Sequence, residues 1–91
     1  PELNIKLNEG EQHKLIAELQ ETASFPGAKE IIKIDGLRVE YKGGFGLMRP
    51  SNTTPVIVLR FEADTEKKLQ EIQDQFKSIL TEHISPEKIP F

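Results

Sequence analysis

Residues 30–44 read EIIKIDGLRVEYKGG, two runs of strand-forming residues joined by Asp35-Gly36. The first run is rich in Ile and the second contains Val and Tyr, residues that favour the pleated, half-buried surface of a β-strand. A two-residue hairpin turn of type I′ needs positive φ at both central positions, and Asp-Gly suits that conformation. The stretch therefore predicts an antiparallel hairpin with strands at 30–34 and 37–42 and a tight turn at Asp35-Gly36.

Further strands are expected on both sides of this hairpin. Residues 2–7 alternate strictly between polar and apolar, which predicts a half-buried strand. Lys42-Gly43-Gly44 predicts a second turn, leading into a short strand from about Phe45 to Met48. Residues 56–63, VIVLRFEA, form the longest run, and its continuous apolar start places it near the centre of the sheet.

Two helices are expected, each with one apolar stripe. The first follows Asn8, which forms a capping box with Glu11 three residues later, and ends at Phe25-Pro26-Gly27. The second follows Asp64 as its N-cap. Apolar residues at helical spacing are Leu15, Ile16, Leu19 and Ala23 in the first, and Leu69, Ile72, Phe76, Ile79 and Leu80 in the second. The order of elements predicts an α+β fold, an antiparallel sheet of four to five strands with two helices packed on one face.

Length and composition narrow the class of protein. The chain has 91 residues, of which 36% are hydrophobic and 30% charged, as expected for one small globular domain. The net charge of −3 argues against a general nucleic-acid binder. The chain has no cysteine, so it can form neither disulfides nor thiolate metal sites, and a reducing cytoplasm is compatible. No apolar run approaches the roughly 18 residues of a membrane span, so no membrane partner is expected.

The ends of the chain favour an excised domain. It begins at Pro1, and its only methionine is Met48. Residues 85–91 resemble a tail beyond the last regular element. We therefore expect a folded, monomeric domain whose function belongs to a longer protein.

The sequence shows no catalytic apparatus. His13 and His83 have no neighbours at metal-ligand spacing, and the carboxylates fall mainly on polar faces of the expected elements. No serine occurs in a nucleophile-elbow context. Gly43 to Gly46 lack the spacing of a phosphate-binding glycine loop, which favours a hairpin turn with close backbone approach. Neither a catalytic residue nor a metal site is expected in this domain.

The stretch RPSNTTP at 49–55 has a different chemistry. Arg49 carries a planar fork of donors that matches a phosphate group. Prolines at both ends stiffen the stretch, and turns of this kind expose backbone N–H groups that can bind an anion. Further donors come from Ser51, Asn52, Thr53 and Thr54. Such side chains also cap their own backbone in ordinary surface loops, so both interpretations stay open on residue chemistry alone.

The same stretch resembles the phosphate-binding loop of the α-D-phosphohexomutases, the family of phosphomannomutases and phosphoglucomutases. The resemblance extends to residues 35–39 and 58–63, and it covers most of the chain from Leu3 to about Leu80. It implies that residues 1–84 are the C-terminal domain of such an enzyme, the fourth of four, with a fold like the TATA-box-binding protein. Residues 85–91 would follow as a tail of undetermined structure.

The resemblance also implies site residues and partners. Arg49, Ser51, Asn52 and Thr53 would contact the substrate phosphate, with Thr54 a weaker candidate, and Pro50 would stiffen the loop. The substrates would be mannose or glucose 1- and 6-phosphates. Mg²⁺, the phosphoserine and a hexose 1,6-bisphosphate activator would belong to the full enzyme, because their motifs lie in its other three domains. The isolated domain should therefore be inactive, and the enzyme is expected in the cytoplasm.

An alternative function uses the face of the sheet that the helices leave open. Arg38, Arg49, Arg60 and Tyr41 could line a nucleic-acid or protein-binding surface. The acidic balance of the chain and the shortage of surface aromatic residues argue against this hypothesis.

Overall fold

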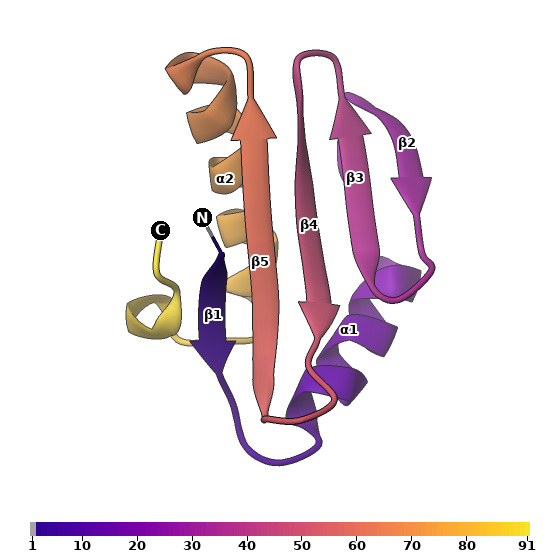
Figure 1. The fold of residues 1–91 in the computed structure, drawn as a ribbon, viewed down its shortest axis with the longest axis vertical. Helices are drawn as coiled ribbons and strands as arrows, with labels where there is room; N and C mark the ends of the chain where they lie inside the picture. The colour runs from indigo at the N-terminus through magenta and orange to yellow at the C-terminus, as the bar shows by residue number, and fades with distance from the viewer. Residues whose placement is uncertain (1) are drawn as a thin grey trace.

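Five antiparallel strands form a single sheet in the computed structural model, which describes residues 2–91 (Figure 1). The strands are β1 (Leu3–Lys6), β2 (Ala28–Ile32), β3 (Leu37–Tyr41), β4 (Gly44–Pro50) and β5 (Val56–Ala63). Their order across the sheet is β1-β5-β4-β3-β2, so β4 is central and β5 is its neighbour. The long 56–63 strand was expected near the centre, and it lies one place from it.

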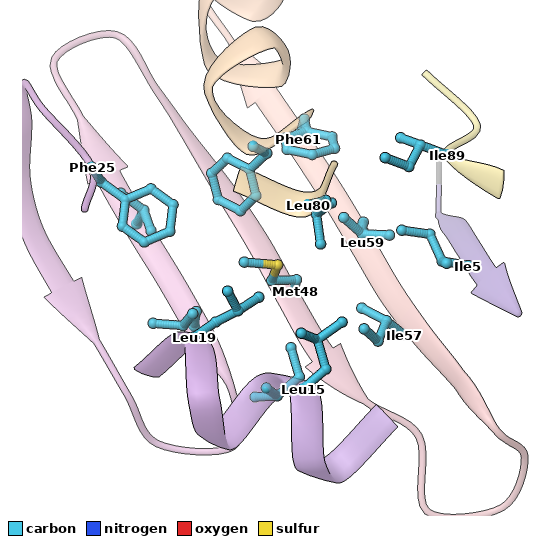
Figure 2. Close-up of a cluster of buried hydrophobic side chains, with 14 of the residues drawn as sticks. Ile5, Leu15, Leu19, Phe25, Met48, Ile57, Leu59, Phe61, Leu80 and Ile89 are labelled. Carbon is cyan, nitrogen blue, oxygen red and sulfur yellow. The ribbon is translucent and has the colours of Figure 1, made fainter. Parts of the chain in front are cut away.

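Two helices, α1 (Glu11–Thr22) and α2 (Glu66–Leu80), cover one face of this sheet (Figure 1). Alternate strand residues point to that face, as the period of two in a strand requires. The core lies between the strands and the helices, as Figure 2 shows around Met48. Its main members are Ile5, Leu15, Ile16, Leu19, Leu37, Val39, Met48, Ile57, Leu59, Ile72, Phe76 and Leu80. The predicted α+β class and the single covered face are confirmed.

The hairpin between β3 and β4 shows the close approach expected at residues 43–46. Tyr41 pairs with Gly44, so only Lys42 and Gly43 form the turn, and Gly43 has a φ of 89°. A Cβ at Gly46 would lie 2.5 Å from Cε1 of Phe76. The bare backbone at Gly46 therefore lets the ring of Phe76 rest directly on the central strand.

The hairpin between β2 and β3 corrects the two-residue turn predicted for it. Strand β2 ends at Ile32 and β3 begins at Leu37, so the four residues 33–36 connect them. Ile32 pairs with Arg38, which places Asp35 midway between the paired residues. Positive φ occurs as expected, 59° at Asp35 and 132° at Gly36. The wider turn is held by Gln20 of α1, whose Nε2 donates to the carbonyls of Lys33 (3.0 Å) and Gly36 (2.8 Å). Local turn preference contains no information about this distant side chain.

Both helix starts differ from the expected caps. Helix α1 begins at Glu11 with Gly10 as N-cap, although the Asn8 N–H does donate to Glu11 Oε1 at 2.8 Å. Helix α2 is capped by Thr65, whose Oγ1 accepts from the Lys68 N–H at 3.1 Å. Asp64 lies one residue before this cap, and its N–H donates to the Gly43 carbonyl at 2.8 Å, which closes the adjacent end of the sheet.

Residues 85–91 lie against the domain. They contain a short 3₁₀ helix, η1 (Pro86–Lys88), followed by the buried Ile89. The ring of Phe91 lies 5.0 Å from that of Phe61 of β5, in an edge-on arrangement. The last residues thus extend the hydrophobic core beyond the end of α2. Among residues 2–91, neither α1 nor α2 is long and apolar enough to cross a membrane.

Candidate phosphate-binding loop

The candidate site lies where β4 ends. The stretch 49–55 was expected to be loop throughout, but Arg49 pairs with Val58 and Pro50 with Ile57, so both belong to β4. Proline lacks an N–H and cannot donate to a ladder of strand hydrogen bonds, and Pro50 is the last residue of β4. The loop proper is therefore 51–55, and Arg49 projects from a fixed strand instead of a mobile turn.

Among residues 2–91, Arg49 is the arginine without a partner on the open face of the sheet. Arg38 donates from Nε to Glu40 Oε2 at 2.5 Å and stacks on the ring of Phe45, 4.0 Å from its centroid. Arg60 donates to Glu62 Oε2 at 3.1 Å. The Arg49 guanidinium is exposed and makes no hydrogen bond or ion pair within residues 2–91. Its donor fork is thus available to an external anion.

Ser51 organises the loop that follows. Its Oγ accepts from the backbone N–H groups of Thr53 (3.2 Å) and Thr54 (3.3 Å). The same oxygen lies 3.3 Å from Thr53 Oγ1 and 3.2 Å from Thr54 Oγ1. The loop thus caps its own backbone, as one of the two interpretations expected. It also gathers several donors around one oxygen, the arrangement that a phosphate oxygen needs.

Asn52 lies at the tip of the loop. It is exposed, and neither its side chain nor its backbone N–H finds a hydrogen-bond partner in the described part of the chain. The five predicted residues therefore fall into three groups. Ser51, Thr53 and Thr54 are brought together, Asn52 is unpartnered beside them, and Arg49 stands at the strand end that leads into the loop.

The loop is anchored from two other elements. The Leu7 N–H, just after β1, donates to the Pro55 carbonyl at 2.8 Å. Nε2 of Gln12 in α1 donates to the carbonyls of Ser51 (3.1 Å) and Thr54 (3.3 Å). The sequence reasoning missed Gln12, although a signal for it existed. It precedes Leu15, Ile16 and Leu19 by three, four and seven residues, so it lies on the buried stripe of the helix.

The described residues offer little other chemistry. No group of three or more His, Cys, Asp or Glu side chains within residues 2–91 could hold a metal ion. His83 lies 3.9 Å from Glu18 Oε2, far along α1 from the loop. Burial raises the pKa of Tyr41 to about 12.

The open face does not have the composition that the alternative function requires. Tyr41 is buried on the helix-covered face, where its hydroxyl donates to Gln75 Oε1, so its assignment to the open face was wrong. The reason is the strand period, since Leu37, Val39 and Tyr41 of β3 all point to the helices. Arg38 and Arg60 are neutralised by Glu40 and Glu62.

Together these features define an α+β domain with an unpaired arginine and a cluster of hydroxyl and N–H donors at one end of its sheet. A family model described as the C-terminal domain of phosphoglucomutase/phosphomannomutase matches residues 2–79, and the chain belongs to this family. The resemblance seen in the loop motif is thereby confirmed.

Individual relatives agree with this assignment. A phosphoglucomutase of Neisseria meningitidis serogroup B is 62% identical over 81 residues, which are 88% of this chain and 18% of that protein. A phosphomannomutase/phosphoglucomutase of Pseudomonas aeruginosa is 46% identical over 91 residues, 100% of this chain and 19% of that protein. The crystal structure of a phosphoglucomutase/phosphomannomutase family protein from Burkholderia thailandensis superimposes with a TM-score of 0.83 at 48% identity, over 100% of this chain and 19% of that one. The chain thus spans about a fifth of the length of these relatives.

Proposed function

We propose that this domain binds the phosphate group of a hexose phosphate in a phosphomannomutase/phosphoglucomutase and closes the active site over it. The whole enzyme would interconvert hexose 1-phosphate and hexose 6-phosphate of mannose or glucose. The observation that carries the proposal is the unpaired guanidinium of Arg49 directly before the donor cluster of residues 51–54. The names of the relatives supply the reaction.

The chemistry of the loop fits such a reaction. Arg49 would take the phosphate through two parallel N–H···O bonds. A phosphate oxygen would replace Ser51 Oγ as acceptor for the N–H groups of Thr53 and Thr54, and the freed hydroxyl would itself donate. Because one acceptor oxygen replaces another, this exchange of hydrogen bonds costs little free energy. Asn52 would add its unpartnered N–H and its side-chain amide.

A loop that contacts only the phosphate group of the substrate, and not the sugar, also suits a mutase. The substrate must present first one end and then the other to the reacting centre, so the distal phosphate is carried by C1 in one orientation and C6 in the other. Closure of this domain would exclude water from the phosphorylated enzyme. Mg²⁺ and the hexose 1,6-bisphosphate belong, in this proposal, to the remaining domains of the longer chain, which are partners of this one. The cytoplasm remains the expected compartment, since a chain without cysteine depends on no disulfide.

Titration of the 91-residue chain with glucose 1-phosphate tests the binding site. The amide signals of residues 49–54 should shift, whereas those of α2 and of the Lys42-Gly43 turn should stay. Binding should be weak, roughly millimolar or about −4 kcal/mol, because a phosphate on an open loop stays hydrated and screened. A parallel titration with a single-stranded oligonucleotide tests the alternative function. Shifts spread over β3 and β5 with the oligonucleotide, and none in the loop with the sugar phosphate, would overturn the proposal.

A further inference from the structure

In the part of the chain that the structure describes, Gln12 is the one buried polar or charged residue, only 6% exposed, in the first turn of α1. Burying an amide is unfavourable unless its polar atoms find partners. Both of its partners lie in one loop about forty residues along the chain, the carbonyls of Ser51 and Thr54. An apolar residue would complete the stripe of α1 without this cost, so packing alone does not account for a glutamine here.

The orientation of the amide is determined by its surroundings. Both acceptors are carbonyl oxygens, so the NH₂ group must face the loop. Oε1 is buried without a hydrogen-bond partner among residues 2–91. The hydrogen bonds of the Gln12 amide therefore all go to the loop: Nε2 donates to its two carbonyls, and Oε1 bonds nothing else among residues 2–91.

The hydrogen bond from Gln12 to the Ser51 carbonyl also orients the Asn52 N–H, which belongs to the same peptide unit. In a planar trans peptide the C=O and the following N–H point in opposite directions. The unit that begins with the Ser51 carbonyl ends with the Asn52 N–H. Because Gln12 draws that carbonyl towards α1, the Asn52 N–H is directed away from the helix, and it is unpartnered in the described part of the chain. A hydrogen bond to the carbonyl also polarises the peptide, which strengthens its N–H as a donor.

We propose that Gln12 is a positioning residue for phosphate binding, which fixes both ends of the 51–54 turn and directs the Asn52 N–H towards the bound phosphate. This inference rests on the proposed function of the loop. Gln12 acts through the backbone and does not itself touch the substrate. Its removal should therefore weaken substrate binding more than it slows the chemical step.

The test uses the full-length mutase that carries this domain, with glucose 1-phosphate as substrate. Gln12→Met keeps the length and helix propensity of the side chain and removes its donors. KM should rise about threefold to tenfold while kcat stays within about twofold, since the lost interactions bind the ground state and the transition state alike. Gln12→Asn, which retains the amide but is one methylene too short to reach both carbonyls, should raise KM in the same direction and decides the question if the Met variant does not fold.

Gln75→Met is the matched control. Gln75 is also a helix glutamine whose Nε2 donates to a loop carbonyl, that of Pro26 at 3.0 Å, but this contact lies next to β2 and not at the 51–55 loop. It should leave KM within about twofold. Equal increases of KM in the Gln12 and Gln75 variants, or no increase in either Gln12 variant, would overturn the positioning role. Arg49→Ala separates the two proposals: if it raises KM and the Gln12 variants do not, the proposed function stands without this inference, and if it has no effect, both fall.

Discussion

A methyl group at Gly36 would lie 2.9 Å from the Cα of Arg49 and 2.5 Å from the carbonyl oxygen of Met48. The turn between β2 and β3 therefore rests against the backbone of β4 at the residue that carries the unpaired guanidinium. The Asp35-Gly36 turn thus packs directly on the end of β4 that carries Arg49, although the two are separated in sequence.

Gly36→Ala should destabilise the domain by more than about 2 kcal/mol. The substitution adds a clash with backbone atoms to the strain of a φ of 132°, and such positive-φ strain alone costs roughly 1 kcal/mol or more. Gly27→Ala is the matched control, because Gly27 has a φ of 85° with open space around the missing Cβ. Urea unfolding of both variants measures the difference. Equal losses would show that the contact with β4 contributes nothing.

Arg49→Ala should lower kcat/KM of the full-length enzyme by roughly tenfold to a hundredfold or more, since charge-assisted hydrogen bonds contribute roughly 1.5–3 kcal/mol each. Arg49→Lys should recover only part of this loss, because an ammonium group keeps the charge but not the planar fork. Arg60→Ala, on the same face but already paired with Glu62, should change kcat/KM by less than about threefold. Similar losses at Arg49 and Arg60 would point to a general effect of charge.

The 91-residue chain alone should not interconvert hexose phosphates, with or without Mg²⁺. The reaction needs a metal ion and a group that accepts and returns the phosphoryl group, both assigned in this proposal to the other domains, and residues 2–91 contain no group of three or more His, Cys, Asp or Glu side chains that could hold the metal. A coupled assay with glucose 1-phosphate at high protein concentration measures this. Turnover that remains after the chain is purified again would contradict the proposal that the phosphoryl-accepting group and Mg²⁺ belong to the other domains.

Thr65→Ala should lower the free energy of unfolding by roughly 1 kcal/mol, the usual effect of losing a helix N-cap. Asp64→Ala should cost only a few tenths of a kcal/mol, because its side chain contributes to α2 mainly through its charge near the helix N-terminus. Thermal unfolding of the two variants compares them directly. A larger loss at Asp64 than at Thr65 would reverse the assignment of the cap.

Stability should fall as the pH rises from about 10 to about 12. Burial raises the pKa of Tyr41 to about 12 in the folded chain, whereas an exposed tyrosine titrates near 10. The stabilising contribution is therefore complete below pH 10 and is lost as the pH approaches the folded value. Tyr41 is the only tyrosine, so its ionisation can be followed by ultraviolet absorbance. In Tyr41→Phe the fall over this range should be smaller, and an unchanged pH dependence would argue against a buried phenol.

Much of the candidate site could be predicted from local sequence. Arg49 and the donors at 51–54 are adjacent in the chain, so no fold was needed to bring them together. The pairing of Arg38 with Glu40 and of Arg60 with Glu62 was also accessible, because residues two apart share one face of a strand. Local sequence could not show that Ser51 Oγ accepts hydrogen bonds from the N–H groups of Thr53 and Thr54. The same residue types occur both in surface turns and in anion sites.

The sequence by itself determined the α+β class, the existence of the strands and the apolar stripes of both helices, because these depend on periods of two and 3.6 residues within one segment. Only the tertiary structure decided the register of the β2–β3 hairpin and the anchoring of the loop. Each depends on hydrogen bonds between distant segments: Gln20 to Lys33 and Gly36, and Gln12 to Ser51 and Thr54. Such partners become neighbours only after the core has formed, so no local pattern contains them.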